Sequence, residues 1–81
     1  MRRIAAYLVH QLEATILVPK NADFLSAKME NAELWIYASV DPEEKNQARH
    51  VWVIDNREVP LHSRYVDHVE INGQRFHIFT D

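Results

Sequence analysis

The clearest structural signal in the sequence is Tyr65-Val-Asp-His-Val-Glu-Ile-Asn-Gly-Gln-Arg-Phe-His-Ile-Phe-Thr-Asp81, which contains the only glycine of the chain. Asn72-Gly73 separates two runs of alternating apolar and polar residues, and Asn-Gly favours a type I′ turn because both central residues need a positive φ. A two-residue loop fixes the register of the hairpin. The predicted pairs are Ile71 with Gln74, Glu70 with Arg75, Val69 with Phe76, His68 with His77, Asp67 with Ile78, and Val66 with Phe79.

Successive side chains of a strand point to opposite faces, so this hairpin has one mostly apolar face and one polar face. The apolar face, which we expect in the core, holds Tyr65, Val69, Ile71, Phe76 and Ile78. The polar face, which we expect at the surface, holds His68, Glu70, Arg75 and His77.

Composition limits the classes of protein that remain. The 81 residues make one domain, residues 1–81, which is small enough for its stability to be modest. A net charge of −3, with scattered basic residues, argues against direct binding of nucleic acid. The chain has no cysteine, and the apolar run after Met1 ends at His10-Gln11, too early for a signal peptide or a membrane span. We therefore expect a cytoplasmic protein.

Residues Ile4–Val18 fit two secondary structures. Apolar residues recur every four positions and good helix formers are frequent, which permits a helix. Read as strands, Ile4, Ala6 and Leu8 alternate with Ala5, Tyr7 and Val9, and a second β-rich run ends at Pro19. The residue pattern leaves both readings open.

The segment Phe24–Val40 predicts a second hairpin, because its latter half is rich in aromatic and β-branched residues. A four-residue loop, Met29–Ala32, brings apolar residues opposite each other. The predicted pairs are Lys28 with Glu33, Ala27 with Leu34, Ser26 with Trp35, Leu25 with Ile36, and Phe24 with Tyr37.

The remaining segments complete an all-β prediction. A solvated loop covers Asp41–Gln47, a strand covers Arg49–Asp55, and Val59–Arg64 with Pro60 is a connection or an edge. We predict a small antiparallel sandwich or partly open barrel of six to seven strands. Its predicted core consists of Leu25, Leu34, Ile36, Val40, Val51, Val53, Val69, Phe76 and Ile78.

Motifs spread over most of the chain resemble an uncharacterised family of small phage and prophage domains. They are Pro19, Phe24-Leu25-Ser26, Leu34-Trp35, Val40-Asp41-Pro42, Arg49, Tyr65 with Val69, and Phe76-His77-Ile78-Phe79. The chain departs from the family at Asp55-Asn-Arg-Glu58, where members tend to have a glycine-rich turn with a histidine, and at Val66-Asp67, where a glycine is common. The resemblance implies all-β structure, which favours strands in Ile4–Val18, and a phage-related origin.

The sequence contains no motif that holds catalytic or phosphate-binding residues, and we expect neither an enzyme nor a cofactor. His68 and His77 are weak metal-ligand candidates, with His50 or His62 as a third, and the alternative is that they are surface histidines. We expect a binding protein that blocks a host macromolecule, such as a defence component. A structural virion or decoration protein is the alternative.

A contact surface for a host or phage protein follows from the same strands. Strand alternation places Trp35 and Tyr37 on the face opposite Leu34 and Ile36, and an apolar content of 47% leaves more large side chains than one small core can hold. The candidate partner-binding residues are Trp35, Tyr37, Trp52, Glu70 and Arg75. A second copy that covers one face would make the protein a homodimer.

Overall fold

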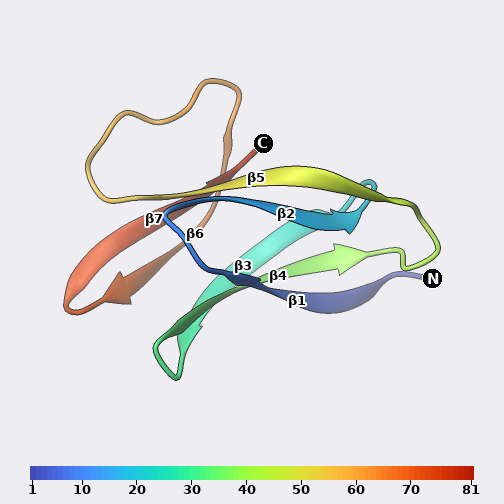
Figure 1. The fold of residues 1–81 in the computed structure, drawn as a ribbon, viewed down its shortest axis with the longest axis horizontal. Coiled ribbons are helices and arrows are strands. Elements are labelled where there is room, and N and C mark those ends of the chain that lie inside the picture. The colour runs from blue at the N-terminus through green and yellow to red at the C-terminus, as the bar shows by residue number, and fades with distance from the viewer.

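The computed structural model describes residues 1–81 as seven antiparallel strands without a helix (Figure 1). They pack as two layers that are not closed into a barrel, which confirms the predicted all-β sandwich. No helix of this chain could cross a membrane. The strands are β1 (Arg3–Val9), β2 (Glu13–Pro19), β3 (Asp23–Glu30), β4 (Glu33–Val40), β5 (Asn46–Ile54), β6 (Arg64–Ile71) and β7 (Gln74–Thr80).

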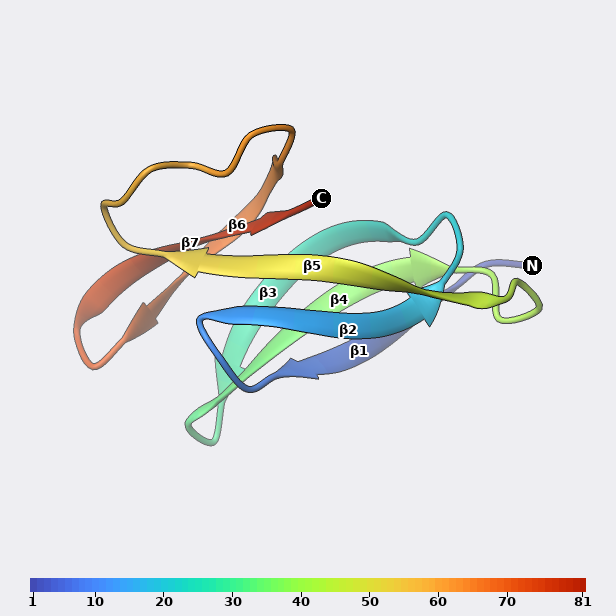
Figure 2. The ribbon, with the colours of Figure 1, turned by 45° about the horizontal axis from the view of Figure 1, so that its top comes forward.

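One sheet has the strand order β1-β4-β3 and the other has the order β2-β5-β7-β6. Figure 2 shows β2 and β5 of the second sheet passing in front of the first sheet, with β6 and β7 extending to the left. The chain crosses from one sheet to the other between β1 and β2, so the ambiguous segment Ile4–Val18 forms two strands and no helix. Burial alternates along both strands, so every second residue of β1 and of β2 faces the core. A single helix would place a different set of residues, spaced three or four apart, toward the core.

The core lies between the sheets and is built mainly from aliphatic side chains of the central strands β4, β5 and β7. Leu34, Ile36, Val40, Val51, Val53, Val69 and Ile78 are buried, as predicted. Phe76 is only partly buried but packs against this cluster. The prediction for Leu25 is wrong, since its side chain is 46% exposed. The cause is a bulge at Leu25, which breaks the alternation of β3.

The C-terminal hairpin has the predicted register from Ile71–Gln74 to Asp67–Ile78. A bulge at Val66 then pairs Tyr65, and not Val66, with Phe79. Because a bulge places two residues opposite one, Tyr65 moves to the face of His68 and His77, where its side chain is 53% exposed. The predictions of a Val66–Phe79 pair and of an inward Tyr65 are therefore wrong.

The β3–β4 hairpin is tighter than predicted. Glu30 pairs with Glu33 and Met29 with Leu34, so the loop is the two residues Asn31-Ala32 and not Met29–Ala32. Both loop residues have positive φ, 52° and 64°, as a type I′ turn requires. Each β3 residue therefore pairs with the β4 residue two positions beyond the predicted one. Because this shift is an even number of residues, the β3 side chains keep their predicted faces as far back as Ser26. Residue propensities do not predict this turn, because alanine rarely adopts a positive φ.

Replacing Ala32 with glycine is expected to stabilise the protein by about 1 kcal/mol. Ala32 has a left-handed backbone, which a Cβ atom disfavours and which glycine adopts without steric cost. The free energy of unfolding is measured by urea denaturation. Ala48→Gly, at an exposed position inside β5, is the matched control and is expected to destabilise the protein. A loss of stability in Ala32→Gly would contradict the left-handed backbone conformation of Ala32 in this turn.

Candidate functional site

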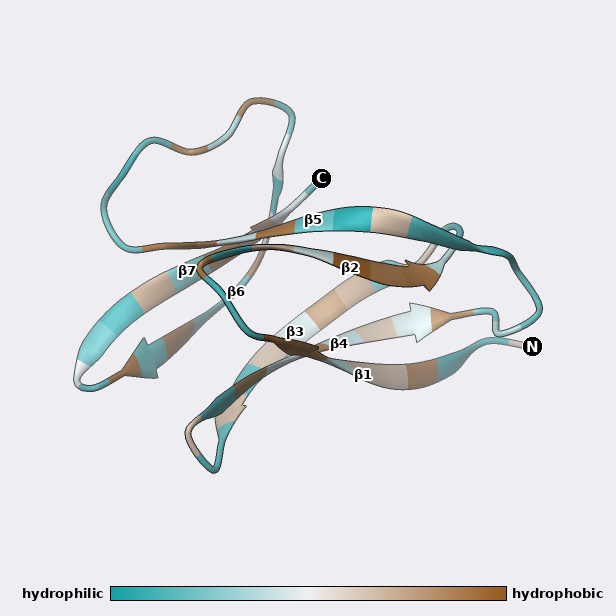
Figure 3. Ribbon diagram, viewed as in Figure 1, coloured by the Kyte–Doolittle hydropathy of each residue, from teal (hydrophilic) through white to brown (hydrophobic).

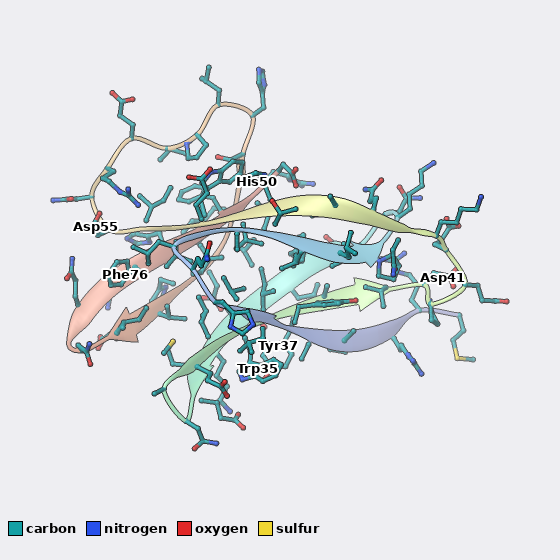
Figure 4. All side chains as sticks on the ribbon, viewed as in Figure 1. Trp35, Tyr37, Asp41, His50, Asp55 and Phe76 are labelled. Atoms are coloured by element: carbon teal, nitrogen blue, oxygen red, sulfur yellow. The ribbon has the colours of Figure 1, made fainter.

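The five predicted partner-binding residues lie on two opposite faces of the sandwich. Trp35 and Tyr37 lie on the outer face of β1-β4-β3, opposite the buried side chains of β4. Trp52, Glu70 and Arg75 lie on strands of the other sheet and point away from the core. Figure 4 shows Trp35 and Tyr37 close together, with His50 on the far side of the molecule. The structure thus has two candidate surfaces, one on each sheet.

The first surface, called here the Trp35–Tyr37 face, is the outer face of β1-β4-β3. Its β1 residues are Ile4, Ala6 and Leu8, of which Ile4 is 60% exposed. Strand pairing puts Leu8 and Lys28 on either side of Trp35, and it puts Ala6 and Ser26 on either side of Tyr37. Two aromatic side chains therefore stand in the centre of a sheet face whose β1 side is entirely apolar.

The polar tips of both aromatic side chains reach solvent. Neither the indole N–H of Trp35 nor the hydroxyl of Tyr37 makes a hydrogen bond within the chain, and no buried side-chain nitrogen or oxygen lacks a partner. Neither ring stacks on another aromatic ring of the chain. Trp and Tyr combine a large apolar area with one hydrogen-bonding tip, which suits them to contacts with another protein.

The turn end of this face is acidic. Glu30 and Glu33 are directly paired across β3 and β4, a placement of like charges that destabilises a sheet. Lys28 lies 3.5 Å from a carboxylate oxygen of Glu30, whereas Glu33 has no ion pair. A shallow hollow of about 260 Å³ lies here, lined by Ala6, Glu30, Asn31, Glu33, Trp35 and Tyr37. An aromatic surface beside the one uncompensated carboxylate of Glu33 attracts a Lys or Arg side chain by charge and by cation–π contact.

The second surface, called here the histidine face, is the outer face of β2-β5-β7-β6. The Tyr65 hydroxyl lies 3.4 Å from Nδ1 of His68 and 3.4 Å from Nδ1 of His77. The ring centroids of the two histidines are 6.4 Å apart, so the predicted pairing does bring them together. No group of three His, Asp or Glu side chains is placed to hold a metal ion.

The remaining aromatic residues of the histidine face contact one another. The ring of His50 stacks on Trp52 with centroids 4.8 Å apart, and its Nε2 lies 3.3 Å from a carboxylate oxygen of Glu13. The ring of Tyr65 meets the edge of Phe79 at 5.4 Å. These side chains already have partners within the chain, in contrast to Trp35 and Tyr37.

An apolar hollow of about 370 Å³ opens at one end of the sandwich, where the turns after β1, β3 and β6 come together. Leu12, Met29 and Ile71 are among its lining residues, and His10, Gln11 and Glu33 are its polar ones. Binding sites for small molecules place several polar groups so that they converge on the ligand. Here His10 and Gln11 come from the turn after β1 and Glu33 is the first residue of β4, so the polar groups lie at the rim and the hollow is not assigned a ligand.

Comparison with known proteins places the whole chain in one family. A family model described as a domain of unknown function, DUF7352, matches residues 1–81. The chain belongs to this family. No curated protein matched it, and neither did any solved structure. The match confirms that the chain belongs to a family of unknown function, over its full sequence.

The sequence interpretation missed the residues that complete the Trp35–Tyr37 face. Ile4, Ala6 and Leu8 join it only if residues 4–9 form a strand beside β4, and their alternation was the available signal. Glu30 and Glu33 join it only through the tight Asn31-Ala32 turn. Tyr65 was placed on the wrong face of its strand, because no feature of the sequence marks the bulge at Val66.

Proposed function

We propose that this protein is a non-enzymatic, phage-encoded protein that binds and blocks a basic host protein in the cytoplasm. The observation that carries this proposal is the Trp35–Tyr37 face, on which two aromatic side chains without partners adjoin the unpaired carboxylate of Glu33. The resemblance to phage domains is the reason for naming a phage origin and a host target. A defence component is one such target.

The chemistry of the face supports a protein partner. Binding energy at protein interfaces is concentrated in a few residues, and Trp and Tyr are enriched among them. Partly exposed rings fixed on the central strand of a sheet lose little conformational freedom on binding. The net charge of −3 and the acidic turn end favour a partner with a basic surface, because complementary charges speed and orient association.

The test is capture from a host lysate with immobilised wild-type protein, followed by mass spectrometry. We expect a basic host protein to bind the wild type and Tyr65→Ala but not Trp35→Ala. Tyr65 is the matched control, since it is an exposed aromatic residue on the histidine face. Retention of the same partner by Trp35→Ala, or its loss in Tyr65→Ala, would contradict the proposed surface.

With the captured partner purified, Trp35→Ala is expected to weaken binding about 30-fold or more, the effect of a central interface residue. Glu33→Gln is expected to lower the association rate and to reduce its dependence on salt, because Glu33 is a charge at the edge of the face. Surface plasmon resonance at two salt concentrations measures both effects. An unchanged salt dependence in Glu33→Gln would contradict the claim that the charge of Glu33 attracts the partner.

A structural role in a phage particle is the second candidate function. The observation that favours it is the free edge of β1, because proteins that join larger assemblies often do so by adding strands to an exposed edge. A particle protein should sediment with virions, whereas a blocking protein should remain with its host target.

A further inference from the structure

We infer that the free edge of β1 binds β1 of a second copy of this chain, in antiparallel orientation and centred on Ala6. The pairing would form one continuous six-stranded sheet with the order β3-β4-β1-β1-β4-β3. This inference concerns the backbone edge of β1, whose residues Ile4, Ala6 and Leu8 also belong to the Trp35–Tyr37 face. It does not rest on the proposed function, because association of two copies is measured without the host partner.

The first support comes from a comparison of the four edge strands. An exposed strand edge pairs readily with another chain, and natural proteins protect such edges with prolines, charges, bulges or covering segments. β2 begins with Glu13 and ends with Pro19. β3 and β6 each contain a bulge, and the carboxylate of Asp67 in β6 binds the amide of Ala27 in β3.

β1 has neither a proline nor a bulge, and its single charge is Arg3 at its first residue. After Arg3 it reads Ile-Ala-Ala-Tyr-Leu-Val, without a charge, a proline or a bulge. Its backbone pairs with β4 alone, and none of the backbone hydrogen bonds outside the sheets involves a residue of β1. In Figure 1 β1 forms the lower border of its sheet, and Figure 3 colours it brown to tan over most of its length beyond Arg3.

The nearest flanking charge is also held away from the edge. The Nε of Arg2 donates a hydrogen bond to Oγ of Ser39 at 2.9 Å, and its guanidinium also binds the carbonyl of Asn21 at 3.1 Å. Ser39 lies in β4 and Asn21 lies in the turn between β2 and β3, so both acceptors are on the side of β1 that faces away from its free edge. The guanidinium therefore does not block strand addition.

β1 is complementary to itself in one register. With Ala6 opposite Ala6, Ile4 pairs with Leu8 and Ala5 pairs with Tyr7, so apolar side chains meet on both faces. The only charged residue, Arg3, falls opposite Val9, and no like charges oppose each other. The contact is symmetric and closes after two copies, as expected for a twofold homodimer.

We infer a second copy of this chain as the partner of β1 because the strand is almost uncharged and pairs with itself in the Ala6-centred register. The association is expected to be weak. One seven-residue strand pair with the flanking Ile4 and Leu8 side chains is a small interface, of the kind found in weak and reversible complexes. The two Trp35–Tyr37 faces would lie on the same side of the joined sheet, so a dimer would present two partner-binding faces in one direction.

Sedimentation velocity across micromolar concentrations tests the association. The wild type is expected to shift from monomer to dimer as concentration rises. Ala6→Lys should remain monomeric at every concentration, because two lysines would face each other on the twofold axis. Ala48→Lys, the same change at an exposed position of β5, should dimerise as the wild type does. A monomeric wild type, a dimeric Ala6→Lys or assembly beyond the dimer would overturn the inference.

Single-cysteine variants test the register, since the natural chain has no cysteine. Opposed Cβ atoms in an antiparallel pair lie about 4.5–5.5 Å apart, close enough for a disulfide with small adjustment. Ala6→Cys is expected to oxidise to a covalent dimer. Ile4→Cys should not, because the two copies of that position would lie roughly 14 Å apart along the strand direction. Faster crosslinking through Ile4→Cys than through Ala6→Cys would overturn the proposed register.

Discussion

Replacing Ile36 with alanine is expected to lower the free energy of unfolding by about 2–5 kcal/mol, a loss large enough to unfold so small a domain. The Ile36 side chain is fully buried on the central strand β4 and belongs to the larger core cluster. Its truncation removes apolar contacts with both sheets and leaves a cavity that the strands cannot close without breaking their pairing. Urea denaturation followed by tryptophan fluorescence measures the change.

Leu25→Ala is the matched control for this experiment. It removes a similar number of atoms from the strand next to β4, but the Leu25 side chain projects outward from a bulge. We expect a change of about 0.5 kcal/mol or less. Equal losses in the two variants would mean that the bulge in β3 is misplaced and that Leu25 lies in the core.

The second large effect is expected for Asp67→Ala, at about 1–3 kcal/mol. One carboxylate oxygen of Asp67 accepts a hydrogen bond from the backbone N–H of Ala27 at 2.9 Å, and the other accepts one from its neighbour His68 at 2.8 Å. The first bond joins β6 of one sheet to β3 of the other. Its loss leaves a partly buried amide without a partner and loosens this side of the sandwich.

Amide hydrogen exchange identifies the cause of that loss. The Ala27 amide should exchange faster in Asp67→Ala, because the carboxylate that protects it is gone. Asp55→Ala serves as the control: Asp55 also accepts a hydrogen bond from the next backbone N–H, at 2.7 Å, and one from the Gln74 side chain at 3.3 Å, but neither hydrogen bond bridges the two sheets. Unchanged protection of Ala27 in Asp67→Ala would show that the carboxylate does not bridge the sheets.

The parts of the fold that follow simple rules could be predicted from the sequence. Asn72-Gly73 sets the turn type and thereby five strand pairs of the last hairpin. Alternation along β4 separates Leu34 and Ile36 from Trp35 and Tyr37, and the structure places the first pair inward and the second outward. Both rules depend only on local backbone geometry, which neighbouring residues determine.

The errors have a common physical origin in positions where the backbone departs from those rules. The bulges at Leu25 and Val66 each add one residue to a strand, and they lie in β3 and β6, which contact each other where the sheets meet. The Asp67–Ala27 hydrogen bond joins β6 to β3 within two residues of each bulge, and we attribute the bulges to this tertiary contact and not to local sequence. The Asn31-Ala32 turn likewise places alanine in a conformation that its propensity disfavours.

The binding surface could be predicted only in part, because it depends on which strands become neighbours. The sequence placed Trp35 and Tyr37 outward but grouped them with Trp52, Glu70 and Arg75, which the sandwich puts on its opposite side. A list of exposed aromatic residues carries no information on the sheet to which each strand belongs. The order β1-β4-β3 supplies that information and adds the apolar residues of β1 to the face.

The most direct test of the central claim is a hydroxyl-radical footprint of the protein in complex with the basic partner captured from the host. We expect oxidation of Trp35 and Tyr37 to fall on binding, while oxidation of Trp52 and Tyr65 on the histidine face is unchanged. Protection of Trp52 and Tyr65, with Trp35 and Tyr37 still reactive, would show that the partner binds the histidine face and not the Trp35–Tyr37 face.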